Sequence, residues 1–209
     1  MTLPELSGIG HRVRLPPGRD VVLTDRFRTI VDSEPFQRLR RIRQLGPTHL
    51  VYPGAVHTRF EHSLGVYGYT AKCIASLLRD PNVAQSLDEE SIVTVLAAGL
   101  LHDIGHYPFA HSLEALHRTG KDTPRHEVLG TDCVVHELGA VLEKSLGVSG
   151  RRVASLFGVS WSEHTGVDSL LASIISSALD ADKMDYLERD SAHLGVPYGQ
   201  SFDVDRLLA

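Results

Sequence analysis

The chain has 209 residues, a length that suits one domain with a substantial hydrophobic core. Its formal net charge of -5 gives no general reason to expect nucleic-acid binding, and whether the protein has a nucleic-acid partner is left open. Its longest apolar run, about ten residues, is too short to cross a bilayer. Residues 1–14 have no apolar signal-peptide core, and the two cysteines, Cys73 and Cys133, are isolated. These features exclude a thiolate zinc site and predict a reduced, cytoplasmic protein with no membrane partner.

The N-terminal part predicts an irregular arm and then a helix. Residues 1–20 are rich in proline and glycine and predict an irregular arm with room for a short extended piece. Residues 21–25 predict a brief strand or turn, so we expect an arm over residues 1–24. Asp32–Pro35 has the character of a helix start, and apolar residues recur at helical spacing over 36–45. The arginines of this helix are either a solvated face or a cationic wall for phosphates.

A long helix is expected next. Thr58 and Glu61 have the spacing of a capping box, which predicts a helix from about 59 to 79. His62 falls in the first turn of this helix, and a turn is expected at 80–82.

The following helix ends in polar side chains. It should begin at 88–91, and its apolar run ends at His102-Asp103. Seven of the 12 histidines lie between residues 57 and 126, which is the anomaly of the composition. An apolar helix that ends in histidine and aspartate can deliver both side chains to a buried site. The alternative is a core helix followed by exposed histidines.

The second half of the chain predicts further helices. Helices are expected at 112–117, 126–146 and 164–179, with loops at 120–124 and 147–163. After them, Asp182, Tyr186 and Asp190 recur every four residues and so share one helix face. Several helices with little strand predict an all-α fold, with one helical domain over residues 25–209.

Four residues at helix ends suggest a metal site. His62, His102, Asp103 and Asp182 make a mixed nitrogen and oxygen set that suits Mn, Fe, Co, Ni or Zn, with Mg as a further option. Four protein ligands around a six-coordinate ion leave positions for water and a substrate oxygen. Other residues complete the hypothesis: protons handled by His106, His111 and His126, phosphates held by Arg59 and Lys183, and a sugar met by Tyr186 and Asp190.

This pattern of histidine, histidine-aspartate and aspartate resembles the HD-domain metal phosphohydrolases. Flanking segments resemble, more narrowly, the deoxynucleoside triphosphate (dNTP) triphosphohydrolases, in the branch that contains the human SAM- and HD-domain enzyme. These segments are Phe36–Arg40, Gln44–Gly46, Pro53–Ala55, His57–Val66, His102–His106 and Asp182–Tyr186. With breaks, the resemblance runs from about residue 25 to 208.

The resemblance implies a reaction and a set of roles. A dNTP and water would give a deoxynucleoside and tripolyphosphate, with attack at the α-phosphorus. It implies a divalent transition metal, Mg with the substrate triphosphate, and a homo-oligomer. By position, the metal ligands are His62, His102, Asp103 and Asp182; the triphosphate is held by Arg59, Lys183 and Tyr186; the deoxyribose meets Gln44, Leu45 and Asp190; and the catalytic group is His106, His111, Glu114 and His126, with His126 in the proton-transfer position. Glu114 stands where close relatives have aspartate.

Two departures from the family pattern lead to further expectations. The family enzymes continue beyond the last residue of this chain, so we expect either a C-terminally truncated form of the family domain or a short paralogue. In the resembled branch a guanine nucleotide at a second site drives assembly, and Asp32, Gln37 and Arg40 match residues that read guanine there. The other half of that site, an Asn-Asp-Pro-Ile-His-Gly-like motif, is replaced by Leu15–Asp20. We therefore predict that guanine nucleotides do not activate this protein in the relatives' manner.

Two other functions stay open from the sequence. The chain could be another HD phosphohydrolase, such as a nucleotidase or a phosphodiesterase, although Gln44 and Asp190 match the deoxyribose side. It could also be a non-catalytic regulator that binds nucleotides or nucleic acid. The complete metal set and the pair His111 and His126 argue against an inactive site.

Overall fold

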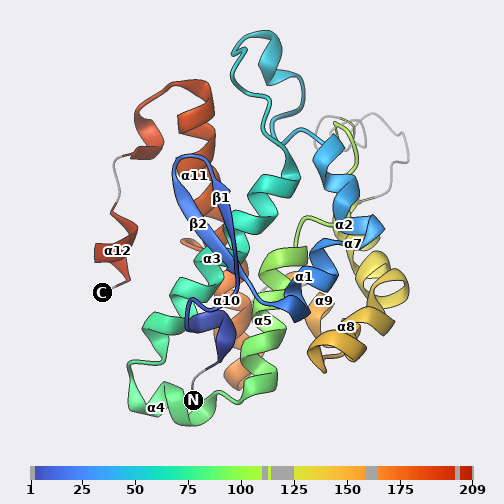
Figure 1. Cartoon of the computed structure of the whole chain (residues 1–209), viewed down its shortest axis with the longest axis vertical. Helices are drawn as coiled ribbons and strands as arrows, with labels where there is room; N and C mark the ends of the chain where they lie inside the picture. Colours follow the sequence, from blue (N-terminus) through green and yellow to red (C-terminus); the bar gives the residue numbers. More distant parts are fainter. Residues whose placement is uncertain (1–2, 110–112, 114–124, 159–163, 201–202, 209) are drawn as a thin grey trace.

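The computed structural model describes residues 3–109, 113, 125–158, 164–200 and 203–208 (Figure 1). Most of these residues are helical, and within them the sheet consists of two strands. The prediction of an all-α fold is confirmed. Among the described residues, no helix combines the length and the apolar character that a membrane span requires.

Two helices form the centre of the molecule. In α5 (Glu89–Leu101) every side chain from Ser91 onwards is buried, as expected of a helix that is apolar on all sides. It packs against α3 (Arg59–Leu77), and α10 (Gly166–Ile175) and α11 (Ala181–Leu194) complete the layer around the pair. The four metal ligands predicted from the sequence lie at or next to ends of α3, α5 and α11.

Side-chain caps set where the central helices begin. Thr58 accepts a hydrogen bond from the Glu61 N–H and Asp88 accepts one from Ser91, which confirms both predicted starts. Asp180 caps α11 in the same way.

The N-terminal arm is more ordered than predicted. A short 3-10 helix, η1 (Pro4–Leu6), precedes an antiparallel hairpin of β1 (His11–Leu15) and β2 (Arg19–Leu23), which packs on α3. The short extended piece and the brief strand that the sequence predicts here are the two strands of this hairpin, whose regular pairing replaces the irregular structure expected between residues 11 and 20. Its strands are short, and only their alternate apolar residues face the core.

The arginine-rich segment is not one helix. It contains α1 (Asp25–Val31), α2 (Glu34–Gln37) and two 3-10 helices, η2 (Arg38–Arg41) and η3 (Gly46–Leu50). The helix predicted over 36–45 therefore ends early. Phe36, Leu39 and Ile42 are buried at intervals of three residues, a period that suits a 3-10 helix, and Arg43 then pairs with Thr58 in a bridge.

The remaining helices correct three further boundaries. A helix, α4 (Pro81–Ser86), follows Asp80 where a turn was expected. The predicted helix over 126–146 is divided into α7 (His126–Asp132), a π-helical turn η5 (Cys133–Glu137) and α8 (Gly139–Leu146). The predicted loop over 147–163 contains α9 (Gly150–Gly158), whose residues Val153, Ala154 and Leu156 are buried. The chain continues through η7 (Tyr198–Gln200) and α12 (Val204–Leu207), while the predicted elements at 112–117 and 120–124 lie outside the described residues apart from Leu113.

Candidate metal centre and active site

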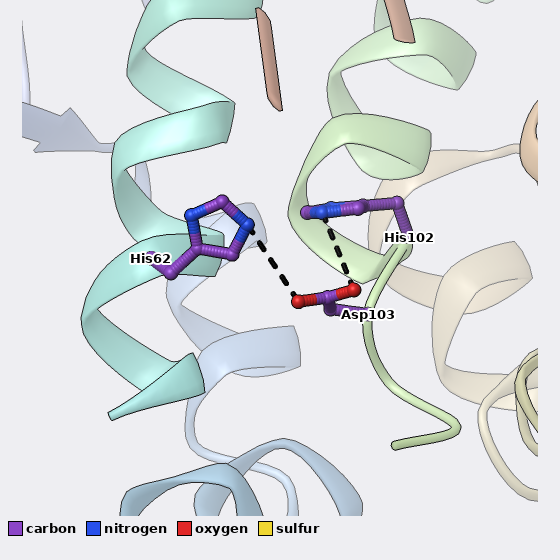
Figure 2. A group of neighbouring side chains, drawn as sticks. All are labelled: His62, His102 and Asp103. Atoms are coloured by element: carbon purple, nitrogen blue, oxygen red, sulfur yellow. Dashed lines mark ion pairs between the residues drawn. The ribbon is translucent and has the colours of Figure 1, made fainter. Parts of the chain in front are cut away.

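Three helix ends bring the four predicted ligands together. His62 lies in the first turn of α3, His102 caps the C-terminus of α5 with Asp103 directly after it, and Asp182 lies in the first turn of α11. Figure 2 shows the Asp103 carboxylate with one oxygen toward the His62 ring and the other toward the His102 ring. The two rings are 5.2 Å apart and nearly perpendicular.

The side-chain atoms of this group are within reach of one ion. The ligand atoms of His62, His102 and Asp103 lie within 4.8 Å of one another. His62 Nε2 is 3.6 Å from Asp103 Oδ2, and His102 Nε2 is 3.6 Å from Asp103 Oδ1. Asp182 Oδ1 lies 3.0 Å from His62 Nε2 and 3.8 Å from His102 Nε2. The structure thus brings the four residues together, while their role as ligands stays a prediction.

The hydrogen bonds of the histidines test whether these residues fit a metal. The Nδ1 atom of His102 is 2.9 Å from the Gly99 carbonyl, and Nδ1 of His62 is 2.8 Å from Asp185 Oδ2. Each Nδ1–H thus donates to an oxygen, which leaves the lone pair on Nε2. Both Nε2 atoms are buried, and neither has a hydrogen-bond partner within the described part of the chain. Two such nitrogens beside two carboxylates fit a divalent transition metal.

The charges of the cluster also favour a cation. Burial alone would raise the pKa of Asp103, but Arg59, His102 and His106 hold it well below its usual range. Burial opposes ionisation of Asp182 as well, and His62 lowers the pKa of that carboxyl. Burial lowers the pKa of His62, but the carboxylates of Asp182, Asp185 and Asp103 raise it to about 10. Ionised carboxylates thus surround the imidazole, and a metal ion would compete with its proton.

A pocket of about 370 Å³ opens beside this cluster. Its lining contains five residues that the sequence assigned to substrate or proton transfer: Gln44, Arg59, His106, His126 and Tyr186. The remaining lining residues are His102, Asp103, Glu127, Phe157, Ile175, Ser176 and Asp182. One N–H of Arg59 donates to Asp103. Metal-competent and cationic side chains therefore share one pocket.

The proton-transfer candidates lie together where they are described. The rings of His106 and His126 are 3.9 Å apart, and His106 Nδ1 lies 3.1 Å from Asp103 Oδ1. Burial, which outweighs Asp103, lowers the pKa of His106. The helix ends before His106, so His102 and His106 do not share a helix face. The predicted catalytic residues His111 and Glu114 lie outside the described residues.

Three other predicted substrate residues are not part of the described pocket lining. Lys183 Nζ donates to Asp180 at 2.7 Å and to the Ser177 carbonyl at 2.8 Å, so it supports the start of α11. Asp190 accepts from His57 Nε2 at 2.7 Å, and Leu45 precedes η3.

The predicted regulatory residues make local contacts. Gln37 donates to the Val31 carbonyl and accepts from Arg40 Nε at 2.7 Å, while the Arg40 guanidinium stacks on the Phe60 ring at 3.6 Å. Asp32 is exposed and pairs with Arg28.

Sequence reasoning missed several residues that support the site. Arg38 donates to the carbonyls of His106 and Ile104 and so holds the loop after Asp103. Asp185 and Arg189 stand behind His62. The spacing of Asp185 and Arg189, four residues apart on one helix, was the one available signal for that pair. The contact of His57 with Asp190 joins residues far apart in the chain and has no local signal.

Comparisons with known proteins identify the domain that carries this cluster. The family model of the HD domain matches residues 59–190, a span that contains all four predicted ligands. Uncharacterized protein YwfO of Bacillus subtilis is 39% identical over 191 residues, which are 91% of this chain and 40% of that protein. Uncharacterized protein MJ1154 of Methanocaldococcus jannaschii is 39% identical over 190 residues, 91% of this chain and 35% of that protein. The deoxynucleoside triphosphate triphosphohydrolase SAMHD1 of Homo sapiens is 36% identical over an alignment of 213 positions, gaps included, which covers 86% of this chain and 32% of that protein. The chain therefore spans less than half of the length of these relatives.

Proposed function

Because the chain belongs to the HD domain family, we propose that it is a metal-dependent phosphohydrolase and that its substrates are deoxynucleoside triphosphates. The observation that carries the proposal is a pocket lined by His102 and Asp103 of the metal-competent cluster and by the buried cation Arg59. The likeness to SAMHD1 supports the substrate class. In the proposed reaction, water attacks the α-phosphorus and the bond from that phosphorus to the 5′ oxygen breaks. The 5′ oxygen takes a proton, so the products are a deoxynucleoside and tripolyphosphate.

The residues of the pocket suggest how the metal and the phosphates are bound in this reaction. A divalent ion held by His62, His102, Asp103 and Asp182 supplies Lewis-acid activation of a phosphate and of water. Arg59 uses one N–H for Asp103, and a guanidinium has five, so others remain for phosphate oxygens. That contact holds the guanidinium in place before substrate arrives, which is how a fixed charge stabilises a transition state.

The two imidazoles beside the cluster suit proton transfer. His106 and His126 both line the pocket, and an imidazole there can deliver a proton to the departing 5′ oxygen. The sequence resemblance assigns this step to His126.

The sugar side of the proposal rests on Gln44. Its side-chain oxygen, Oε1, is buried and has no hydrogen-bond partner among the described residues. A buried acceptor without a donor costs free energy, and a substrate hydroxyl would remove that cost. Gln44 and Tyr186 line the same pocket, so a deoxyribose between them would meet an acceptor and a phenolic hydroxyl.

The experiment is a product analysis with purified protein. The chain is loaded with Mn²⁺, incubated with each of the four dNTPs, and the products are separated by chromatography. Tripolyphosphate and deoxynucleoside in equal amounts would support the proposal. Orthophosphate or pyrophosphate would indicate a nucleotidase, and tight dNTP binding without turnover would indicate a regulator. A parallel incubation with cyclic nucleotides tests for a phosphodiesterase, which would give the ring-opened product. The matched control is His102→Ala, which should lose Mn²⁺ and activity together.

The finer expectations also stand as proposals. We expect a homo-oligomer, a cytoplasmic location, a boundary between an N-terminal arm and the domain after residue 24, and a role for Lys183 and Asp190 in the loaded site.

A further inference from the structure

Behind the metal-competent face of His62 lies a buried ion pair that no predicted role uses. His62 Nδ1 donates to Asp185 Oδ2 at 2.8 Å. Arg189 donates to both oxygens of the same carboxylate, through Nε to Oδ2 at 2.8 Å and through Nη2 to Oδ1 at 2.7 Å. The side chains of Asp185 and Arg189 are each only 2% exposed. A carboxylate in this place has three donors around it and one fixed orientation.

The neighbouring backbone makes room for this pair. A Cβ atom on Gly65 of α3 would lie 1.9 Å from Asp185 Oδ1 and 2.4 Å from a terminal nitrogen of Arg189. The glycine therefore allows the ion pair to pack directly against the helix that carries His62. On its far side Arg189 donates to the Pro16 carbonyl at 2.8 Å, which joins the pair to the turn of the β1–β2 hairpin.

Burial of two charges needs a reason, because an apolar pair of similar volume is often as stable. Here the geometry supplies one. A carboxylate that accepts from Nδ1–H fixes the tautomer and the orientation of an imidazole, so that Nε2 presents its lone pair to a metal. Arg189 in turn fixes the carboxylate with a two-pronged hydrogen bond.

We propose that Asp185 and Arg189 are positioning residues of the metal centre, which hold His62 in the orientation and tautomer that bind the ion. This inference rests on the proposed metal centre. It makes a statement about metal affinity, so it can be tested without any nucleotide.

The test compares two double variants of the full chain. Asp185→Asn with Arg189→Gln removes both charges together, so no unpaired charge is left buried. The matched control is Glu5→Gln with Arg26→Gln. It removes another two-pronged pair, in which Arg26 donates to both oxygens of a fully buried Glu5 carboxylate away from the cluster. The affinity for Mn²⁺ is measured by calorimetric titration and the melting temperature by circular dichroism. His102→Ala serves as the benchmark for loss of the site.

The expected result is Mn²⁺ binding about 10- to 100-fold weaker in the Asp185/Arg189 variant and unchanged in the Glu5/Arg26 variant. If both double variants melt at a lower temperature but bind Mn²⁺ as the parent does, the pair is only structural and the inference fails. If His102→Ala binds Mn²⁺ normally, the metal centre itself is refuted. Should the Asp185/Arg189 variant not fold, Arg189→Lys is used instead, because it keeps the positive charge and loses the two-pronged hydrogen bond to Asp185. It should bind Mn²⁺ about tenfold more weakly, and parental affinity would overturn the proposal.

Discussion

Replacing Gln44 with methionine should remove the recognition of the sugar hydroxyl. The side chain is of similar length, so the substitution takes away the amide while it keeps most of the volume. The backbone around it is held independently, because the Gln44 N–H donates to the His57 carbonyl at 3.0 Å. The deoxyribose of a dNTP has one free hydroxyl, on the 3′ carbon, and this is the group that we expect to donate to the buried Gln44 Oε1.

The size of the effect follows from the unpaired acceptor. A buried acceptor that lacks its donor costs about 1–3 kcal/mol, which corresponds to a factor of about 5 to 150. The parent protein should therefore prefer dATP over 2′,3′-dideoxy-ATP by about this factor in kcat/KM. In Gln44→Met both substrates leave no acceptor unpaired, so the preference should fall to about 2 or less.

The assay is a cycle of two proteins and two substrates. Initial rates are measured for dATP and dideoxy-ATP with the parent and with Gln44→Met, and Gln85→Met on the exposed surface of α4 is the control. The control should keep the parental preference. An unchanged preference in Gln44→Met, or a parent that does not distinguish the two substrates, would refute the assignment of Gln44 to the sugar.

In the Mn²⁺-loaded protein, Arg59→Ala should lower kcat/KM by about 10²–10³-fold with little change in Tm, because the guanidinium serves phosphate and the ion still meets Asp103. A large fall in Tm with normal kinetics would show instead that Arg59 is a structural partner of Asp103. Glu5→Gln should lower the free energy of unfolding near neutral pH by about 1.5–3 kcal/mol, since hydrogen bonds from Arg26 and Thr24 outweigh burial and lower the pKa of this carboxyl. This stabilisation is complete above the unfolded pKa of 4.5 and is lost as the pH falls through the lower folded pKa. Urea unfolding at about pH 3 should therefore show a smaller difference in unfolding free energy between the parent and Glu5→Gln. A difference as large as that at neutral pH would contradict the ion pair. GTP or dGTP should change neither dATP hydrolysis nor sedimentation, because two successive prolines at Pro16 and Pro17 remove two backbone donors; about tenfold stimulation with growth of the oligomer would restore the relatives' regulation.

The parts of the site that the sequence predicts are those encoded by local signals. Thr58 and Asp88 are capping residues that predict where α3 and α5 begin, and the apolar run of α5 predicts that this helix lies in the core. The position of His62 and His102 at helix ends follows from these signals. The meeting of those ends in one cluster came instead from the family pattern.

The parts that it does not predict depend on contacts between distant segments or on backbone period. Successive prolines in the hairpin turn suggest irregular structure, although Val21 and Leu23 pack into the core. Helix α9 is short and begins next to glycine and serine residues, which are typical of a loop. The pairing of His62 with Asp185 joins residues 123 positions apart, and no local pattern specifies it.

The charges explain why the cluster needs an ion to be complete. Three carboxylates surround His62: Asp103, Asp182 and Asp185. Two of them are paired with an arginine, since Asp103 accepts a hydrogen bond from Arg59 and Asp185 accepts from Arg189. Within the described part of the chain, Asp182 forms ion pairs with His62 and His102. The Asp182 side chain is 34% exposed, yet burial still opposes its ionisation, and a nearby cation would favour the charged form. When the two histidines are neutral, as metal ligands must be, the charge of Asp182 is left for the ion. The ion would then join the first turn of α11 to the ends of α3 and α5.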